Sequence, residues 1–448
     1  MPIATNARME ASIGIGNTRL ERASHYTRGH LFCKRPLLYI LSKYCMRMSD
    51  EMKRMYLDYA ASTPVDTEVE EAMRPYWSEV FGNAGGQHEE GRKAREAVEG
   101  ARARVAEALG SKSTEIIFTS GGTESNNQAI FGLVKALRKE GRTLEEMHAV
   151  TLSVEHPSVL DCFQELEEEG LAVSYLPVDA EGLVSEKVLQ EALRPETVLV
   201  SIAYVNSEIG TVQPIAAFGS VIAAHRKKTG AACYFHTDAS QAPVYFDCAP
   251  DALLVDMVTL DAQKMYGPKG IGILYVRDGV PLASLLKGGS QERGVRPGTP
   301  NTPLIVGFAE SFTRACGARD AESIRVKALR DLFIEKVRDA IPEAEINGTL
   351  EQRTPNNISV SIPGVEGDFV MHALDARGIA CSTRSACFGA KKGNSHVVAQ
   401  LGKSELLVRG TVRFTLGKAT TRADIEKAVD ELASVVVSIP RAQAAVAA

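Results

Sequence analysis

The chain has little excess of either charge, no paired cysteine motif and no long apolar run, and each absence excludes a class of protein. The 51 Lys and Arg residues against 56 Asp and Glu residues give a net charge of -5, so no basic field exists for the phosphates of nucleic acid. The eight cysteines form no CxxC pair, which argues for reduced intracellular thiols and against structural zinc. The longest early apolar run, residues 37–41, is far short of a membrane-spanning helix. We therefore predict no nucleic-acid, membrane or metal partner.

What remains is the composition of an ordinary folded protein. Apolar residues make up 44% and charged residues 24% of the chain, which is close to the globular average. The length of 448 residues suggests two domains or one large enzyme subunit. A disordered or low-complexity chain is excluded.

Residues 1–54 differ from the rest, with ten Lys or Arg residues against four Asp or Glu residues. A basic, acid-poor segment is typical of an organelle transit peptide, whereas its apolar stretch is too short for a secretory signal. Met48 offers an alternative start, since MSDEMKRMYLDYAAS follows it. The sequence favours such a start-site artefact, or a disordered tail. We therefore predict an extension outside the fold and a cytoplasmic protein, or an organelle-matrix protein if residues 1–54 are a transit peptide.

Short β-branched runs alternate with amphipathic stretches from Ile116 onward, as expected for strands separated by helices. The runs are IIFTS, AVTLSV, VLVSIAYV, CYFHTD, MVTL and IGILYV, with helices expected from Thr123, over 158–169 and over 215–228. Nearly continuous apolar strands indicate a mainly parallel sheet that is buried on both faces. The fold class is therefore α/β, with a large doubly wound domain over residues 70–316.

After about Cys316 the pattern changes to that of a smaller α+β domain. We expect helices over 323–341, 367–377 and 422–437 and strands over 357–362 and 411–416. Residues 55–69 and 317–448 are assigned to this domain.

Polar residues follow each apolar run of the larger domain. In order, they are 120–123 (SGGT), 155–156 (EH), 206–208 (NSE), 238–241 (DASQ) and 261–264 (DAQK). Doubly wound sheets bind ligands at the carboxyl ends of their strands. We therefore expect these side chains to share one rim.

Three features of this rim indicate a phosphate-bearing cofactor. Gly121 and Gly122 precede a helix and can present backbone N–H groups to a phosphate, although a tight turn with a Thr123 N-cap is the plainer alternative. Lys264 leaves an apolar strand, where a desolvated amine can form a Schiff base. Asp238 could hold the nitrogen of a pyridine ring protonated, or could merely form a buried ion pair.

From about Tyr56 to Val437 the chain resembles the cysteine desulfurases, which are fold-type I pyridoxal phosphate enzymes of the class V aminotransferase group. The matching stretches are LDYAASTP, FGN with His88 and Gly91, FTSGGTESNN, VEHPSVLD, EIGTVQPI, HTDASQ, KMYGPKGIG, ERGVRPGT, STRSAC and VRFTLG.

The resemblance implies pyridoxal 5'-phosphate as cofactor and a role for each matching residue. Lys264 would form the Schiff base, Asp238 would contact the pyridine nitrogen, and His156 would stack on the ring. The other implied contacts are Gln241, Asn206 and Ser207 near the ring hydroxyl, Thr123 with the Gly122 backbone and Gln263 near the phosphate, Thr299 from a neighbouring subunit of a homodimer, and Arg413 on the substrate carboxylate.

Cys387 matches the nucleophile that takes sulfur from L-cysteine as a persulfide and leaves L-alanine. Nearby Arg384, Lys391 and Lys392 would favour its thiolate. We expect Cys162 and Cys233 to pack inside the protein, whereas Cys381 lies close to Cys387 in sequence. The loop after Cys387 suggests transfer to an acceptor protein, such as a scaffold for iron-sulfur cluster assembly, or to transfer RNA thiolation.

Three positions depart from the family pattern. Asp261 and Gln263 replace the Ser and His of a Ser-Gly-His-Lys run, and Ser207 replaces the second Asn of Asn-Asn-Glu. Like charges close to a phosphate repel, so we expect Asp261 to point away or to be paired. Two alternatives stay open: a related lyase or aminotransferase, such as a selenocysteine lyase, and a non-catalytic scaffold, which these departures suggest.

Overall fold

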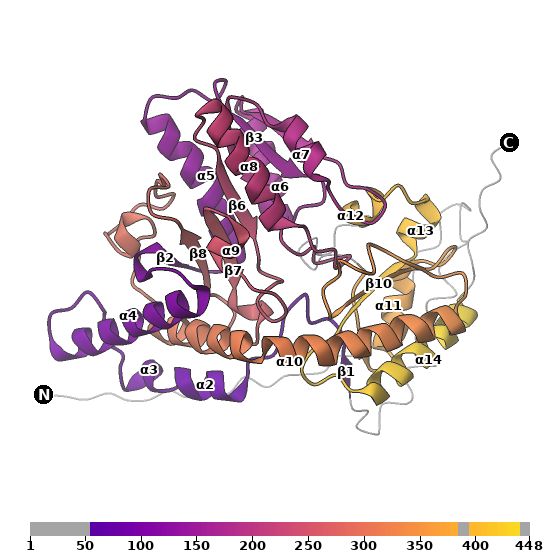
Figure 1. Cartoon of the computed structure of the whole chain (residues 1–448). Helices are drawn as coiled ribbons and strands as arrows, with labels where there is room; N and C mark the ends of the chain where they lie inside the picture. The colour runs from indigo at the N-terminus through magenta and orange to yellow at the C-terminus, as the bar shows by residue number, and fades with distance from the viewer. Residues whose placement is uncertain (1–53, 384–393, 440–448) are drawn as a thin grey trace, which may run out of the picture. The chain divides into compact units, whose positions relative to one another are not determined.

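The computed structural model describes residues 54–383 and 394–439 (Figure 1). These residues fall within one compact unit, which spans residues 52–448. Residues 1–53, including most of the predicted extension, lie outside the described part of the chain. Along the described part, no helix has the length and apolar character that crossing a membrane requires.

The largest element is a seven-stranded sheet with the order β2-β8-β7-β6-β5-β3-β4. Every neighbouring pair is parallel except those of β8, which runs antiparallel to β2 and to β7. The strands are β2 (Ile116–Thr119), β3 (His148–Leu152), β4 (Ala172–Leu176), β5 (Thr197–Ser201), β6 (Tyr234–Asp238), β7 (Met257–Asp261) and β8 (Gly272–Val276). The predicted mainly parallel sheet is confirmed, and β4 is a strand that the sequence reading left out.

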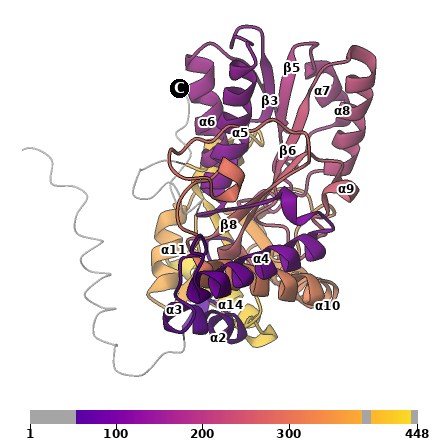
Figure 2. The ribbon, with the colours of Figure 1, turned by 90° about the vertical axis from the view of Figure 1, so that its left-hand side faces the viewer.

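Both faces of this sheet are buried, which explains the continuous apolar runs of its strands. In β2, Ile117 packs in a cluster with side chains of α5 (Gly122–Lys139) and α6 (Pro157–Glu168), whereas Phe118 packs with α4 (Glu89–Leu109) and α8 (Ile215–Thr229). Figure 2 shows α5 and α6 on one side of the sheet and α8 with α7 (Glu186–Ala192) on the other. The doubly wound architecture is therefore confirmed.

The helix expected over 323–341 is confirmed as the second half of a longer helix that begins much earlier. Helix α10 is a continuous helix of 39 residues, Thr302–Ala340, and runs from α4 to α14 in Figure 1. Its first half is apolar and buried, including Ile305, Phe308 and Phe312, so it lacks the polar face by which a surface helix is recognised. The predicted domain boundary at 316/317 falls within this helix, and the division into two domains stays a prediction.

A second, antiparallel sheet follows, with the order β12-β10-β9. Its strands are β9 (Glu345–Ile346), β10 (Asn357–Ser361) and β12 (Thr411–Thr415), accompanied by α11 (Gly367–Asp375), α12 (His396–Ala399), α13 (Glu405–Arg409) and α14 (Arg422–Ser438). The first described strand joins this part, because β1 (Met55–Tyr56) pairs in parallel with β11 (Ile379–Ala380). The remaining short helices are α2 (Thr67–Met73), α3 (Pro75–Ser78) and α9 (Pro250–Leu253). These elements confirm the expected α+β pattern.

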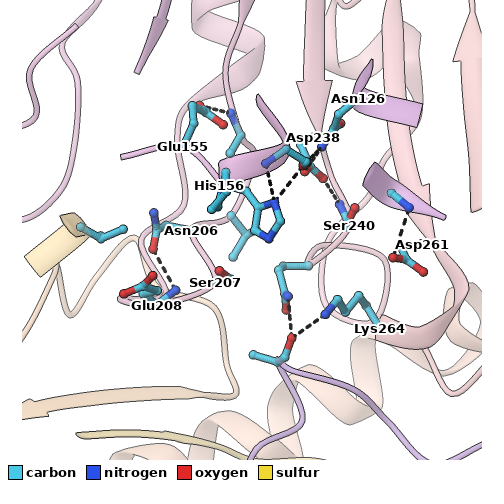
Figure 3. Close-up of a pocket in the computed structure, with 18 of the residues that line it drawn as sticks. Asn126, Glu155, His156, Asn206, Ser207, Glu208, Asp238, Ser240, Asp261 and Lys264 are labelled. Carbon is cyan, nitrogen blue, oxygen red and sulfur yellow. Dashed lines mark hydrogen bonds between the residues drawn. The ribbon is translucent and has the colours of Figure 1, made fainter. Parts of the chain in front are cut away.

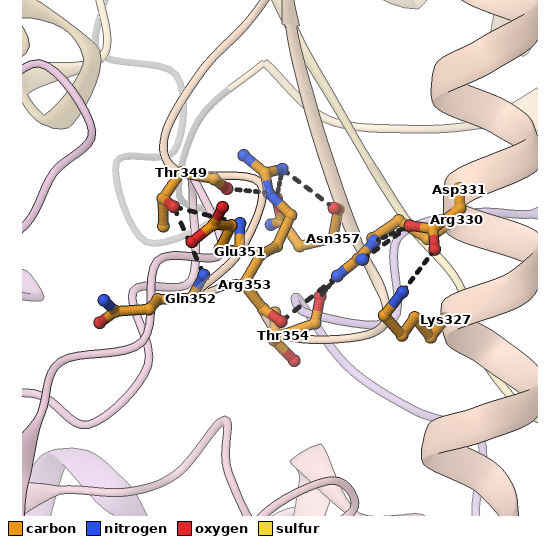
Figure 4. Close-up of polar contacts among 9 residues, drawn as sticks. All are labelled: Lys327, Arg330, Asp331, Thr349, Glu351, Gln352, Arg353, Thr354 and Asn357. Carbon is orange, nitrogen blue, oxygen red and sulfur yellow. Dashed lines mark hydrogen bonds and ion pairs between the residues drawn. The ribbon is translucent and has the colours of Figure 1, made fainter.

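A buried arginine, Arg353, holds together the loop before β10 through its side chain (Figure 4), and its backbone contacts the loop that follows β5. Arg353 donates hydrogen bonds to the carbonyl oxygens of Thr349, at 2.8 Å, and Asn357, at 3.1 Å, and also to that of Asn347. Its backbone pairs with Thr211 in an isolated bridge. Burial, together with the charge of Arg330, lowers the pKa of Arg353 to about 9. Within the described residues, carbonyl oxygens rather than a carboxylate accept from its guanidinium.

Candidate active site

The polar strand ends of the larger sheet meet around one pocket of about 310 Å³ (Figure 3). Residues that follow β2, β3, β5, β6 and β7 all line it, as the rim prediction requires. The pocket is also lined by residues from outside these strand ends, namely Ala60, Ala61, His396, Val397 and Arg413. Parallel strands thus deliver residues that are distant in sequence to one place.

The amine of Lys264 lies at the edge of this pocket. The residue ends the 3-10 helix Ala262–Lys264, which directly follows β7. Its Nζ atom donates to the carbonyl oxygens of Ala60, at 2.9 Å, and Ala61, at 2.7 Å. The side-chain amide of Gln241 also donates to the carbonyl oxygen of Ala60, at 3.0 Å. These neutral acceptors hold the amine in the pocket.

Asp238 ends β6 and extends its carboxylate into the pocket (Figure 3). Oδ1 accepts the backbone N–H of Ser240 at 2.9 Å, and Oδ2 accepts from Nδ2 of Asn126 at 2.8 Å. Among the described residues no Lys or Arg forms a salt bridge with it, and the choice between a cofactor contact and a buried ion pair stays a prediction. The carboxylate is oriented by neutral donors.

His156 is the N-cap of α6, and this position fixes its ring. Nδ1 accepts the backbone N–H of Ser158 at 3.2 Å and lies 2.8 Å from the Ser158 hydroxyl. Pro157 occupies the first turn, where its missing N–H costs nothing. Because Nδ1 accepts a hydrogen bond, the neutral ring carries its proton on Nε2.

Glu155 is a buried carboxyl beside these groups, 1% exposed. Burial, together with the nearby charge of Asp238, raises its pKa to about 8. Oε1 accepts the N–H of Ala203 at 2.7 Å, while Oε2 has no hydrogen-bond partner within the described chain. Glu155 is therefore protonated at neutral pH.

The turn between β2 and α5 departs from expectation in two ways. The helix begins at Gly122 with Gly121 as its N-cap, at φ 148°, so the alternative of a Thr123 N-cap is wrong. The N–H of Gly122 donates to Oδ2 of Asp261 at 3.2 Å. Asp261 also accepts from Nε2 of Gln263 at 3.0 Å. The carboxylate is therefore paired, as the sequence allowed, but it points toward the turn rather than away from it. Thr123 lines the pocket next to this contact.

Arg413 lies on β12, 2% exposed, and lines the pocket from the smaller sheet. It forms a salt bridge with Oδ1 of Asp58 at 2.7 Å and donates to the carbonyl oxygen of Ser207 at 3.0 Å. Its Nε atom is buried and has no hydrogen-bond partner within the described residues. The guanidinium thus keeps donors for a further acceptor.

Asn206 lines the pocket, yet its side-chain amide forms hydrogen bonds with the backbone of neighbouring loops. Nδ2 donates to the carbonyl of Val154 at 2.9 Å, and Oδ1 accepts the N–H groups of Glu208 and Ile209 at 2.9 and 3.1 Å. Ser207 also lines the pocket. Their contact with a cofactor ring stays a prediction.

Thr299 is exposed and does not line the pocket of its own chain, and Cys387 lies outside the described residues. Cys162 and Cys233 are buried, 3% and 1% exposed, as predicted. Burial raises the pKa of Cys381 far above its ordinary value. Its thiol therefore stays protonated and is a poor nucleophile.

The pocket also contains residues that the sequence reading did not assign to the site. They are Asn126, Glu155, Ser158, Ser240 and His396. Glu155 and Ser240 lie within the polar strand ends, so the same rule pointed to them. Asn126 and Ser158 lie one turn into helices, where sequence position alone does not separate them from ordinary helix residues.

A sequence model of the aminotransferase class-V family matches residues 55–428. The chain belongs to this family. The cysteine desulfurase IscS of Dictyoglomus turgidum is 43% identical over 386 residues, covering 86% of this chain and 95% of the relative. The cysteine desulfurase IscS of Methanosarcina thermophila is 40% identical over 389 residues, covering 87% of this chain and 93% of the relative.

Solved structures agree with the family assignment. A structure described as a NifS-like protein has a TM-score of 0.79 and 32% identity, and the match covers 86% of this chain and 100% of that one. A structure of SspA in complex with cysteine has a TM-score of 0.69 and 38% identity, covering 81% and 98%. The fold-type I architecture is confirmed, and the chain is a pyridoxal phosphate-dependent enzyme of the class V group.

The pocket fits this cofactor in its polar groups. It offers an amine, a carboxylate and an imidazole, which suit an aldehyde, a pyridine nitrogen and an aromatic ring. Oδ1 of Asn126 and Oγ of Ser240 are buried in the pocket wall without a hydrogen-bond partner in the described chain. Buried polar atoms of this kind normally find partners, and a bound ligand supplies them.

Proposed function

We propose that the protein is a cysteine desulfurase that converts L-cysteine to L-alanine and holds the released sulfur as a persulfide on Cys387. The observation that carries this proposal is the convergence of Lys264, Asp238, His156 and Arg413 on one pocket. The similarity to cysteine desulfurases over most of the chain supports it. A mechanism follows from what each side chain can do.

Pyridoxal phosphate supplies, when bound, an aldehyde that captures amino groups and a ring that withdraws electrons. Lys264 would hold the cofactor covalently and then move the proton of the substrate's α-carbon. Asp238, oriented by Asn126 and Ser240, would keep a proton on the pyridine nitrogen. His156 would stack on the ring, since its position is fixed by α6.

Arg413 would bind the carboxylate of L-cysteine. Asp58 and the carbonyl of Ser207 use part of its hydrogen-bonding capacity and hold the guanidinium in one orientation. A planar guanidinium can present parallel N–H groups to a carboxylate. The α-carbon of the substrate would thereby be placed between Arg413 and Lys264.

Sulfur transfer would use the thiolate of Cys387 as nucleophile. Its sulfur attacks the sulfur of the substrate, an S–S bond forms, and the substrate's C–S bond breaks with its electron pair moving to the carbon. Protonation of that carbon gives L-alanine, and the enzyme retains Cys387–S–SH, so no external oxidant is needed. A thiol of a partner protein can then remove the outer sulfur.

The partners follow from the same proposal. The protein would act as a homodimer in which Thr299 of one subunit reaches the phosphate site of the other, and its sulfur would pass to iron-sulfur cluster assembly or to transfer RNA thiolation. Thr299 is exposed, as such a role requires. We place the reaction in the cytoplasm, or in an organelle matrix if residues 1–54 direct the chain there.

The test is a cysteine-dependent assay of alanine and sulfide, with and without a thiol reductant. Cys387→Ala should keep the visible absorbance of the cofactor and lose persulfide formation, whereas Cys381→Ala, the matched control, should keep both. Borohydride reduction followed by peptide mass spectrometry should find the pyridoxyl group on Lys264. Unchanged sulfide yield in Cys387→Ala, or label on another residue, contradicts the assignment. A preference for selenocysteine, or no cofactor bound, would favour the two alternatives instead.

A further inference from the structure

A carboxylate lies at the helix end that the proposed function assigns to the cofactor's phosphate. Asp261 is 6% exposed, and its Oδ2 accepts the N–H of Gly122, the first residue of α5. The first N–H groups of a helix have no partner within the helix and favour an anion. Asp261 therefore already supplies an anion at this point.

A second side chain points to the same place. Ser240 is 9% exposed, and its Oγ is buried without a hydrogen-bond partner in the described chain. A Cβ atom added to Gly122 would lie 3.1 Å from this Oγ and 3.3 Å from Oδ2 of Asp261. The amide of Gly122, the Ser240 hydroxyl and the Asp261 carboxylate thus surround one small part of the pocket.

Gln263 completes the arrangement. Its side-chain amide donates to Oδ2 of Asp261 at 3.0 Å, and its backbone N–H donates to Oδ1 at 3.2 Å. No Lys or Arg of the described chain forms a salt bridge with Asp261. The Gln263 amide is engaged as long as the carboxylate stays there.

Resting on the proposed function, we infer that Asp261 competes with the cofactor's phosphate for the amide of Gly122 and so weakens the contribution of the phosphate to cofactor binding. A phosphate that binds here displaces the carboxylate and releases the amide of Gln263, which can then donate to the phosphate. Asp261 and Gln263 are therefore specificity-determining residues for the phosphate group, distinct from those that hold the ring.

The experiment measures the phosphate's contribution directly. Cofactor-free protein is titrated with pyridoxamine 5'-phosphate and with pyridoxamine, which differ only in the phosphate and have no aldehyde to react with Lys264. Dissociation constants come from equilibrium dialysis of wild type, Asp261→Asn and Asp261→Ser. Inorganic phosphate, added as a competitor, reports the same space without the ring.

We expect Asp261→Asn to bind pyridoxamine 5'-phosphate about tenfold more tightly than wild type or better, because one negative charge is removed at close range. Asp261→Ser should bind it at least as tightly, since Ser also frees the Gly122 amide. Pyridoxamine should change by less than about twofold. Asp278→Asn, which removes an equal charge from an exposed salt bridge with Lys112, is the matched control and should leave both constants unchanged.

Equal effects on the two ligands, or weaker binding of the phosphorylated one in both Asp261 variants, overturn the inference and leave the proposed function standing. Failure of wild type and all variants to bind either ligand would overturn the inference together with the proposed function. If Asp261→Asn does not fold, the comparison of Asp261→Ser with wild type decides the question.

Discussion

The buried carboxyl of Glu155 makes a sharp prediction about stability and pH. Its pKa is about 8 in the folded protein, mainly through burial, against an ordinary value of 4.5. Between pH 4.5 and about 8, Glu155 therefore keeps its proton in the folded state and has lost it in the unfolded state. Because the folded pKa is the higher one, this group's contribution to stability is largest at low pH and is lost as pH rises through about 8.

The magnitude follows from the two pKa values. Between pH 6 and 8 the unfolded chain is deprotonated at this position, while the folded protein goes from protonated to half-protonated. The free energy of unfolding should fall by about 2 kcal/mol over this range from Glu155 alone. Glu155→Gln carries no charge at any pH, and its Oε1 can still accept the N–H of Ala203, so it should lack this loss.

The assay is urea unfolding of wild type and Glu155→Gln, both cofactor-free, at pH 6, 7 and 8. The difference between their free energies of unfolding isolates Glu155, because the other titrating groups are shared. We expect it to move by about 2 kcal/mol in favour of Glu155→Gln from pH 6 to pH 8. Glu107→Gln, an exposed position on α4, serves as the charge-matched control. A pH-independent difference between Glu155→Gln and wild type would refute the reasoning.

Three further substitutions test the contacts of the site and the fold. Arg413→Lys should raise the KM for L-cysteine by about tenfold or more with a smaller effect on kcat, measured by sulfide release, because Lys cannot hold Asp58 and a carboxylate with one planar fork. Arg353→Met should lower the free energy of urea unfolding by about 2 to 4 kcal/mol, because buried carbonyls lose a charged donor; an unchanged urea midpoint contradicts this. Gly122→Ala should weaken binding of pyridoxal phosphate, seen in the visible absorbance, because its Cβ, 3.1 Å from Oγ of Ser240, would take up room beside the Gly122 amide that the phosphate needs; unchanged binding contradicts a phosphate site at this amide.

The strands and the rim of the site could be predicted because one physical cause produces both signals. A parallel sheet buried on two faces requires continuous apolar runs, and its carboxyl ends place the next polar residues at one edge. This rule identifies Asp238 and Lys264 as site residues from the sequence alone. Residues such as Asn126 could not be found, because a polar side chain near a helix start is equally at home in solvent.

The early start of α10 could not be predicted from hydrophobic periodicity, because its first half has none that is readable. Residues near Phe308 and Phe312 are buried on several sides, so they show neither the alternation of a strand nor the polar face of a surface helix. Only the charged second half has a readable period. The start is nevertheless marked locally, because Asn301 is the N-cap and accepts the N–H of Leu304 at 3.3 Å, and Pro303 lies in the first turn.

Asp261 shows how a correct physical rule can still leave the geometry undecided. Repulsion between like charges led to the expectation that its carboxylate would point away from the phosphate site or be paired. The carboxylate responds to the same positive helix end that would attract a phosphate, and so it accepts the amide of Gly122. The repulsion is then a property of cofactor binding rather than of the folded chain by itself. A carboxylate in place of a neutral hydroxyl at an anion site therefore competes with the anion for the same donors. The affinity difference between phosphorylated and unphosphorylated ligands measures this competition, whereas the stability of the folded chain does not.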